Sequence, residues 1–592
     1  MCGIFGYRDF NSNPLSNDVL ENMSIKINHR GPDGVGIYHD EEQSLALGNV
    51  RLAIIDVEHG QQPFFSDDKK IVVVQNGEIF NHIELAKELA DDGFTFNTTC
   101  DTEVILRLYE RDGISGLSKM NGMFAISIYD KNEDKLFLIR DRVGEKPLHY
   151  YFDGKRIVYS SEIKGILPAI ENVKLSFTAL EQFFSFNYVP EPYTLFEKVF
   201  HVSPGTYLEI NKNGIQEHQW WGVSDLKVQD FSESEWITRF NKTLADATAI
   251  RLRADVPFGA FLSGGVDSST VVGLMTQSMD QPVKTYSIGF DDPKYDESPY
   301  ALEAAKRFNT QHVSEIVEPN MLNLWEQVIY HCDQPHGDVS FMPTYRVAEL
   351  ASRDVKMVLT GDGADELFAG YDKYKEFFSN SENLNLSDSE FISRYANNIS
   401  LFSSDSLKKL FSPFIQEKIS CTELVDRVSS LTNEANGFDR INQALYIDTK
   451  LLLSGNNLVK PDRMGMAVSI ENRAPFLDYR LIELAFQMPG ELKLKNGETK
   501  YIYKKAVSDL IGSSLAYRKK QMFTVPIGDW FKSELKPLCE DLLLSERTVS
   551  RGIFNYDFIE ELLQDHCAGV INNTREIRAL MAFELWCREF LD

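Results

Sequence analysis

Cys2 stands near the start of the chain and carries the side chain with the clearest chemical potential. If an aminopeptidase removes Met1, which it does when the next residue is small, Cys2 becomes the N-terminus with a thiol and a free α-amine. A thiolate is the nucleophilic form of cysteine, and an α-amine titrates near neutrality, so the amine can serve as the local base. The sequence therefore predicts a cysteine nucleophile at position 2. The structural alternative is an ordinary small apolar residue.

Polar residues farther along could complete a site around such a nucleophile. Asn76 and Gly77 follow an apolar run and would place a side-chain amide beside a backbone N–H, a pair that can stabilise an oxyanion. The same dipeptide is a strong hairpin-turn signal, and the local sequence favours the turn. Arg51 could bind a carboxylate through two parallel hydrogen bonds or lie on the surface of an edge strand. Glu78 and Asp101 could receive an ammonium group, or cap helices and face solvent.

A glycine-rich segment, SGGVDSST at 263–270, follows an apolar strand expected over 256–262 and precedes a helix expected over 271–279. In a strand–turn–helix unit, glycines let the backbone approach a phosphate, and unpaired N–H groups at the helix start face the anion. The chain has no GxxxxGKS/T motif and no GxGxxG motif after a strand. Neither a Walker-type ATPase nor a dinucleotide-binding domain is therefore supported. A flexible loop is the structural alternative.

Three carboxylates, those of Asp362, Asp365 and Glu366, follow a strand expected over 355–359. Carboxylates and glycines just after a buried parallel strand suit Mg²⁺ bound to pyrophosphate. A helix start, where acidic residues are also favourable, is the structural alternative. Lys500 could neutralise charge that develops on an α-phosphate, although most lysines are solvated surface charges.

The composition describes a globular protein with more than one core. The chain has 592 residues, of which 43% are hydrophobic and 25% charged, so we expect two or more domains. Its formal charge of -27 argues against a nucleic-acid partner. The absence of an apolar run of about 18 residues and of a signal-peptide pattern predicts no membrane association. The seven cysteines are scattered without a CxxC pair, as expected for a reducing cytoplasm and no zinc site.

Residues 1–215 predict a first domain of short strands and few helices. Strands are expected over 71–74, 123–129, 135–139 and 157–160, and helices over 83–89 and 102–111. Asp101 could cap the second helix. This is an antiparallel α+β pattern.

Residues 216–592 predict a second domain of a different class. A connector near 215–235 leads into a long amphipathic helix expected over 233–252. Strands over 256–262, 283–290 and 355–359 alternate with helices over 297–308 and 342–353. That alternation predicts a doubly wound α/β fold with a parallel sheet and with ligands at the carboxyl ends of its strands. A polar, helical insertion is expected over about 375–445.

Several segments of the first domain resemble the class II glutamine amidotransferases in order and spacing. They are CGIFG at 2–6, HRGPDG at 29–34, Arg51-Leu52, NGEIFN at 76–81 and Asp101-Thr102-Glu103. The resemblance implies an N-terminal nucleophile (Ntn) hydrolase fold, an αββα sandwich, in which Cys2 attacks the side-chain amide of glutamine and releases ammonia. It places the oxyanion hole at Asn76 and Gly77. Glutamine would be held by Arg51, Asn76, Gly77, Glu78 and Asp101.

The second domain resembles the PP-loop ATP pyrophosphatases through SGGVDSS at 263–269. With RMGMAVSIENRAPFLD at 463–478 and Lys500, nearly the full length is similar to asparagine synthetase. This implies amidation of a carboxylate, most simply aspartate, through an acyl-adenylate, with Mg²⁺ and with release of AMP and pyrophosphate. By resemblance, Asp267 and Asp365 would contact the metal, and Asp362 and Lys500 would be catalytic. ATP would be bound by Leu262, Ser263, Gly264, Gly265, Asp267, Ser268, Ser269, Ile288, Thr360 and Gly361.

The acidic segment departs from the family pattern in a way that bears on the acceptor. Well-matched asparagine synthetases carry Ser-Gly-Glu where this chain has Thr360, Gly361 and Asp362, and that glutamate is assigned a place near the acceptor. The shorter side chain therefore leaves open a different carboxylate, such as a nucleotide-sugar uronic acid or a specialised metabolite. A ligase resembling β-lactam synthetase is disfavoured by Cys2, and a non-catalytic sensor by the intact nucleophile and phosphate loop. A homodimer is compatible with the resemblance.

Overall fold

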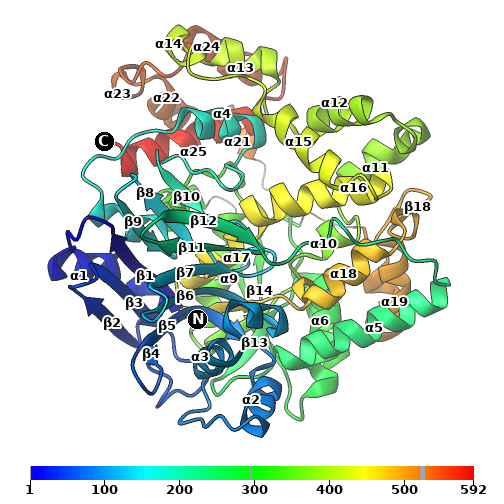
Figure 1. Ribbon diagram of the computed structural model, residues 1–592. Helices are drawn as coiled ribbons and strands as arrows, with labels where there is room; N and C mark the ends of the chain where they lie inside the picture. Colours follow the sequence, from blue (N-terminus) through cyan, green and yellow to red (C-terminus); the bar gives the residue numbers. More distant parts are fainter. Residues whose placement is uncertain (1, 294, 319–320, 520–526) are drawn as a thin grey trace.

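The N-terminal part of the chain forms two six-stranded antiparallel sheets in a computed structural model that describes residues 2–293, 295–318, 321–519 and 527–592 (Figure 1). The first sheet has the order β10-β8-β9-β1-β3-β2: β1 (Cys2–Asp9), β2 (Gly34–Asp40), β3 (Leu45–Arg51), β8 (His149–Phe152), β9 (Arg156–Ser160) and β10 (Val199–His201). The second has the order β12-β11-β7-β6-β5-β4: β4 (Phe64–Phe65), β5 (Ile71–Ile79), β6 (Gly122–Asp130), β7 (Lys135–Arg140), β11 (Thr206–Asn211) and β12 (Gly214–Gln219).

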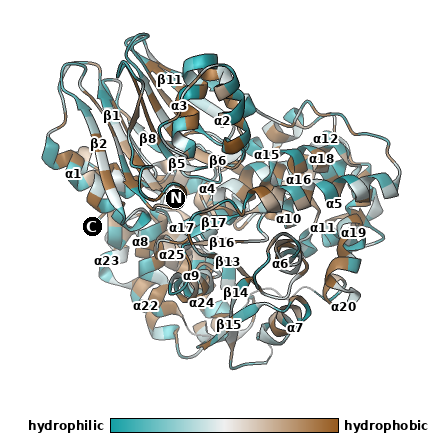
Figure 2. Ribbon diagram, turned by 90° about the horizontal axis from the view of Figure 1, so that it is seen from below, coloured by the Kyte–Doolittle hydropathy of each residue, from teal (hydrophilic) through white to brown (hydrophobic). Residues whose placement is uncertain are grey.

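The two sheets pack face to face because each strand turns apolar residues toward the other sheet. Ile4 and Leu47 of the first sheet share one buried cluster with Val72, Val74 and Leu138 of the second. Helix α1 (Asn17–Lys26) covers the outer face of the first sheet, and α2 (His82–Asp91) and α3 (Asp101–Asp112) lie over the second (Figure 2). This layering confirms the predicted αββα sandwich.

Two local predictions in this sandwich are wrong. Asn76 and Gly77 do not form a turn but lie inside β5, which pairs with β6 throughout its length. Gly77 has φ +149°, and a Cβ there would meet the backbone oxygen of Met123 at 2.1 Å, so close strand packing explains this glycine. Asp101 does not cap α3, since its carboxylate accepts hydrogen bonds from β5 instead.

The C-terminal part is built on a five-stranded, all-parallel sheet of order β15-β14-β13-β16-β17. The strands are β13 (Phe258–Phe261), β14 (Lys284–Phe290), β15 (Gln311–Val317), β16 (Met357–Leu359) and β17 (Glu471–Arg473). Helices α6 (Val266–Ser278) and α7 (Ser298–Phe308) lie on one face, and α9 (Phe341–Ser352) and α17 (Val459–Met466) on the other (Figure 2). The doubly wound prediction is confirmed. The order in which the chain adds strands to the sheet reverses between β13 and β16, and ligands bind at such a point in sheets of this kind.

The sequence prediction for the C-terminal part missed two strands and placed the start of one helix too late. The two edge strands β15 and β17 were not predicted, and α6 begins at Val266 instead of 271. The long helix predicted over 233–252 is α5 (Glu233–Ile250), which starts with a capping box between Ser232 and Glu235.

Additional helices surround the parallel sheet. The segment predicted as a helical insertion contains α11 (Asp372–Ser379), α12 (Asp388–Ile399), α13 (Ser404–Leu410), α14 (Pro413–Gln416), α15 (Glu423–Glu434) and α16 (Arg440–Asp448). A π-helix (Thr449–Asn457) joins α16 to α17, and further helices include α8 (Trp325–Cys332), α18 (Tyr479–Gln487), α19 (Tyr501–Ile511) and α25 (Thr574–Phe590). No helix in the described ranges combines the length and apolar character that a bilayer span requires.

The two halves of the chain share hydrophobic cores. Phe5 and Phe183 cluster with Trp325 and Trp586, and Leu52 with Trp236. The two halves are therefore packed together through common cores. The domain boundary between residues 215 and 216 stays a prediction.

Candidate functional site

Cys2 lies at the start of β1, where strand pairing surrounds it with residues from distant parts of the chain. Its direct cross-strand partner is Arg51, the last residue of β3. The backbone nitrogen of Cys2 is 3.2 Å from Oδ1 of Asn76, which belongs to β5 in the other sheet. Only 5% of Cys2 is exposed. The sandwich thus brings together three residues that the sequence separates by up to 74 positions.

The surroundings of the Cys2 thiol favour its protonated form. Burial raises the pKa of the thiol, while a hydrogen bond from the side chain of Asn49, one from the backbone of Leu52 and the charge of Arg51 oppose that rise. The amide nitrogen of Gln62 lies 4.0 Å from Sγ. A reaction at this sulfur therefore needs a base that removes the thiol proton.

Arg51 is buried, so the surface alternative is wrong. Its Nη2 donates to the carbonyl oxygens of Ile55 at 3.1 Å and Asp56 at 2.6 Å, and its Nη1 donates to that of Val57 at 3.1 Å. A Cβ on Gly60 would approach Nη2 to 2.4 Å, so a glycine is needed beside the guanidinium. These contacts fold the chain after β3 around the guanidinium of Arg51.

Glu78 and Asp101 are both buried, so the reading in which they face solvent is wrong. Burial and the neighbouring carboxylates of Asp101 and Glu471 raise the pKa of Glu78 well above its ordinary value, against the opposing charge of Arg473. Nη2 of Arg473 is 3.5 Å from Oε1 of Glu78, and Oε2 of Glu78 has no hydrogen-bond partner among the residues that the structure describes. Three carboxylates thus lie around the guanidinium of Arg473, with Lys146 also acting on Glu471, so this region is rich in negative charge.

The second group of predicted residues lies at the carboxyl ends of β13 and β16, which are adjacent and parallel. The phosphate loop (263–269) follows β13, and the acidic loop (360–366) follows β16. A Cβ on Gly361 would meet Cβ of Asp267 at 2.6 Å and the backbone nitrogen of Ser268 at 3.0 Å. Glycine at 361 therefore allows the two loops to touch.

The phosphate loop is more helical than predicted. Asp267, Ser268 and Ser269 belong to the first turn of α6. The hydroxyl of Ser268 accepts a hydrogen bond from the backbone nitrogen of Ser263 at 3.2 Å, which closes the loop on itself. Gly264 has φ +71°, and a Cβ there would meet the backbone of Tyr300 at 2.3 Å. Ser269 is fully buried.

Lys500 ties the two loops together. Its Nζ is 2.7 Å from both carboxylate oxygens of Asp267 and 2.7 Å from Oδ1 of Asp365. Burial alone would lower the pKa of Lys500, but the two carboxylates outweigh it and raise the pKa to about 12. The lysine is therefore charged and neutralises part of the carboxylate pair.

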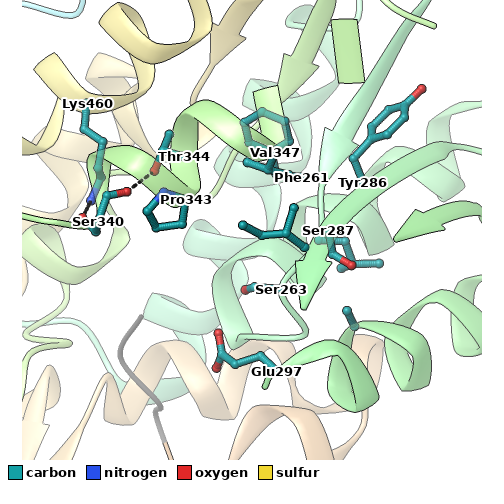
Figure 3. A pocket seen from close by; sticks show the side chains of 13 residues that line it. Phe261, Ser263, Tyr286, Ser287, Glu297, Ser340, Pro343, Thr344, Val347 and Lys460 are labelled. Atoms are coloured by element: carbon teal, nitrogen blue, oxygen red, sulfur yellow. Dashed lines mark hydrogen bonds between the residues drawn. The ribbon is translucent and has the colours of Figure 1, made fainter. Parts of the chain in front are cut away.

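A cavity of about 170 Å³ opens beside the phosphate loop (Figure 3). Leu262 and Ile288 contribute apolar walls, and Ser263 stands at its base. Lys460 of α17 and Ser340 lie at one side, joined by a hydrogen bond of 3.0 Å, and Tyr286 lies at the other. An apolar cavity next to a phosphate loop suits a flat base attached to phosphates.

Asp362 is held by its own loop. The hydroxyl of Thr360 donates to Oδ2 of Asp362 at 2.6 Å. Burial raises the pKa of Asp362, and the Thr360 hydrogen bond and the charge of Lys460 counter that effect. The two positions that differ from the family pattern are thus in direct contact.

The residues present fit a divalent cation only in part. Asp267 and Asp365 offer the oxygen ligands that Mg²⁺ prefers, at an interface of two loops. Among the described residues no group of three or more histidine, cysteine, aspartate and glutamate side chains is arranged to hold a metal. A cation here would therefore depend on further oxygens from a substrate.

Several residues around Cys2 were assigned no role from the sequence. They include Asn49, Gln62 and Ser161, whose hydroxyl is bonded to Ile4 and to Asn76. Isolated amides and hydroxyls carry no local signal. Arg30, inside the quoted HRGPDG segment, donates to the carbonyl oxygen of Cys2 at 3.1 Å and could have been singled out from that motif.

Comparison with known proteins finds two family models on separate parts of the chain. A family model described as asparagine synthase matches residues 239–588, and a glutamine amidotransferase domain matches residues 1–221. Asparagine synthetase (glutamine-hydrolyzing) 1 of Bacillus subtilis is 33% identical, covering 99% of this chain and 96% of that protein. Asparagine synthetase (glutamine-hydrolyzing) 3 of the same organism is 29% identical, covering 90% of each chain. Amidase chyE of Penicillium rubens is 28% identical, covering 95% of this chain and 94% of that protein.

Proposed function

This chain belongs to the family of glutamine-hydrolysing asparagine synthetases, and we propose that it converts aspartate to asparagine with ammonia taken from glutamine. Glutamine-dependent, ATP-using amidation follows from the family. Aspartate as the acceptor is supported by one observation above others, the 33% identity to an asparagine synthetase over 99% of this chain.

The first half-reaction is assigned to the pocket around Cys2. After removal of Met1, the α-amine of Cys2 would take the thiol proton, because burial keeps the thiol protonated. The thiolate then attacks the side-chain carbonyl carbon of glutamine, ammonia leaves, and water hydrolyses the thioester to glutamate. Asn76 and Gly77 would stabilise the oxyanion.

Recognition of glutamine follows from the charges of the same pocket. The α-ammonium group would lie between Glu78 and Asp101, two carboxylates whose burial and mutual repulsion raise the pKa of Glu78. Its α-carboxylate would be held by the remaining N–H groups of Arg51. The unpartnered Oε2 of Glu78 supports this orientation, since a buried carboxylate oxygen without a partner is costly.

The second half-reaction is assigned to the cavity at the end of β13. The acceptor carboxylate attacks the α-phosphorus of ATP, the bond to the bridging oxygen breaks, and pyrophosphate leaves. Ammonia then attacks the acyl carbon, AMP leaves, and the amide forms with loss of a proton. Lys500 and the phosphate loop would stabilise phosphate charge. Asp267 and Asp365 would hold Mg²⁺, which supplies charge neutralisation for pyrophosphate.

A second acceptor class is supported by a specific contact. Thr360 binds Asp362 at 2.6 Å, which draws an already shorter carboxylate back toward its own loop. The extra space could admit a carboxylate bulkier than aspartate. The similarity to a protein named an amidase is compatible with such an acceptor.

An acceptor screen tests the proposal. Pyrophosphate release would be measured with ATP, Mg²⁺ and either glutamine or ammonia, across aspartate, uronic acids and other carboxylates. Aspartate-dependent release accompanied by asparagine formation is the expected result. Release with another carboxylate and none with aspartate would replace aspartate by that acceptor. If none of the carboxylates in the panel supports pyrophosphate release, amidation at this cavity is contradicted.

A further inference from the structure

A network of buried charges joins the two halves of the molecule beside Cys2. Its central members are Arg30, Lys164 and Arg463, which face Glu162, Asp333 and Asp462. Arg30 and Glu162 come from the N-terminal sandwich, while Asp462 and Arg463 belong to α17. The side chains of Arg30, Glu162 and Asp462 are 0%, 1% and 4% exposed. Removing one partner here would leave an uncompensated buried charge.

Arg30 is the member of this network that touches the candidate nucleophile. Its Nε donates to the carbonyl oxygen of Cys2 at 3.1 Å. The other end of the guanidinium is gripped by Asp462, with Nη1 2.8 Å from Oδ2 and Nη2 3.2 Å from Oδ1. Such a two-point contact fixes the plane of a guanidinium and therefore the direction of its Nε–H.

Asp462 contacts fewer cations than Glu162 does. Glu162 is shared among His29, Arg30, Lys164 and Arg463. Asp462 contacts Arg30 most closely and has Lys146 only at 3.6 Å. The orientation of Arg30 thus depends on a carboxylate supplied 432 residues along the chain.

We propose that Asp462 is a positioning residue for glutamine hydrolysis, acting through Arg30 on the backbone of Cys2. The glutaminase site is then completed by the second half of the protein. This inference rests on the proposed function of Cys2 and adds a residue that the amidotransferase region alone does not contain. Lys460, two positions earlier on α17, lines the cavity of the other site, so a single helix contacts both.

The substitution Asp462→Asn removes the charge and keeps the size. Arg30 should turn away from Cys2, and the thiol should lose its alignment with the glutamine amide. A misplacement near 1 Å costs about 100-fold in rate, so the kcat of glutaminase should fall by about that factor. The KM for glutamine should change little, because Arg51, Glu78 and Asp101 are untouched.

The test compares full-length variants in two assays. Glutamate release reports the glutaminase, and ammonia-dependent pyrophosphate release reports the second site. Asp462→Asn should lose glutaminase kcat while ammonia-dependent turnover stays near wild type, and the Tm should fall because the buried Arg30 loses a partner. Asp462→Glu, which keeps the charge, should retain more glutaminase than Asp462→Asn.

A matched control breaks another contact between the halves. Arg253 binds Glu84 at 2.6 Å on the surface, and Glu84→Gln should leave both activities unchanged. Wild-type glutaminase in Asp462→Asn would overturn the inference, as would an equal fall in both assays. If the wild-type protein has no Cys2-dependent glutaminase, the proposed function itself fails, and the inference falls with it.

Discussion

The two candidate sites differ in how their charges are balanced within the protein. Around Glu78, three carboxylates lie near the guanidinium of Arg473, and one oxygen of Glu78 has no hydrogen-bond partner among the described residues. At the other site, Lys500 already contacts both Asp267 and Asp365 at 2.7 Å. The first site is arranged to receive a cation as it stands. The second would have to exchange internal contacts to bind phosphate and metal in the way we propose.

The two sites also differ in the secondary structure that carries their residues. Cys2, Arg51 and Asn76 belong to interior strands of two packed sheets, whose register fixes their separation. The second site is made from loops at the ends of β13 and β16, tied by a lysine that lies at residue 500. We therefore expect substitutions in the first site to affect chemistry in a preformed pocket, and substitutions in the second to affect loop arrangement as well.

The sharpest separation of the two sites is Cys2→Ala. Without a nucleophile, glutamine-dependent amidation should fall by at least about 1,000-fold. Ammonia-dependent amidation should remain, because the second site does not use the thiol. Both activities would be measured by amide formation on the same preparation. Equal loss in the two assays would mean that the sites are not chemically independent.

A smaller effect, this time on the second site and not on the glutaminase, is expected from Asp267→Asn and Asp365→Asn. Each removes a charge that faces Lys500 and the proposed metal, so pyrophosphate release should drop by about 100-fold. Glutaminase should survive, since neither residue approaches Cys2. Asp405→Asn, at an exposed carboxylate of α13 far from both loops in the sequence, is the matched control. Near wild-type pyrophosphate release in both variants would contradict the metal assignment.

The smallest effect is expected at Asp362. If aspartate is the acceptor, Asp362→Glu restores the usual reach of the family and should keep or improve turnover. If the cavity serves a bulkier carboxylate, the added methylene should intrude and lower turnover by about tenfold. Steady-state kinetics of wild type and variant with aspartate separate these outcomes. Thr360→Val, which removes the hydrogen bond to Asp362, would show whether that contact sets the position of the carboxylate.

Some elements could be predicted because their signals are local. Apolar runs marked β5, β6 and β13, and glycine beside short polar residues marked the phosphate loop. The strand β17 was missed because its sequence, Glu471-Asn472-Arg473, is polar. It pairs with β16, and Arg473 is compensated in the interior by Glu471 and Glu78. Likewise, Asn76-Gly77 looks like a turn until β6 pairs alongside it.

The sequence by itself indicated the family of this protein and the chemistry we propose for it, because a cysteine at position 2 and a glycine-rich turn before a helix are recognised from residue types and short spacing. The arrangement of that chemistry was decided by tertiary structure. Strand register set Cys2 opposite Arg51, and the docking of α17 brought Asp462 to Arg30 across 432 residues. Such contacts depend on how sheets and helices pack, and no local pattern records which distant charge will be buried beside which.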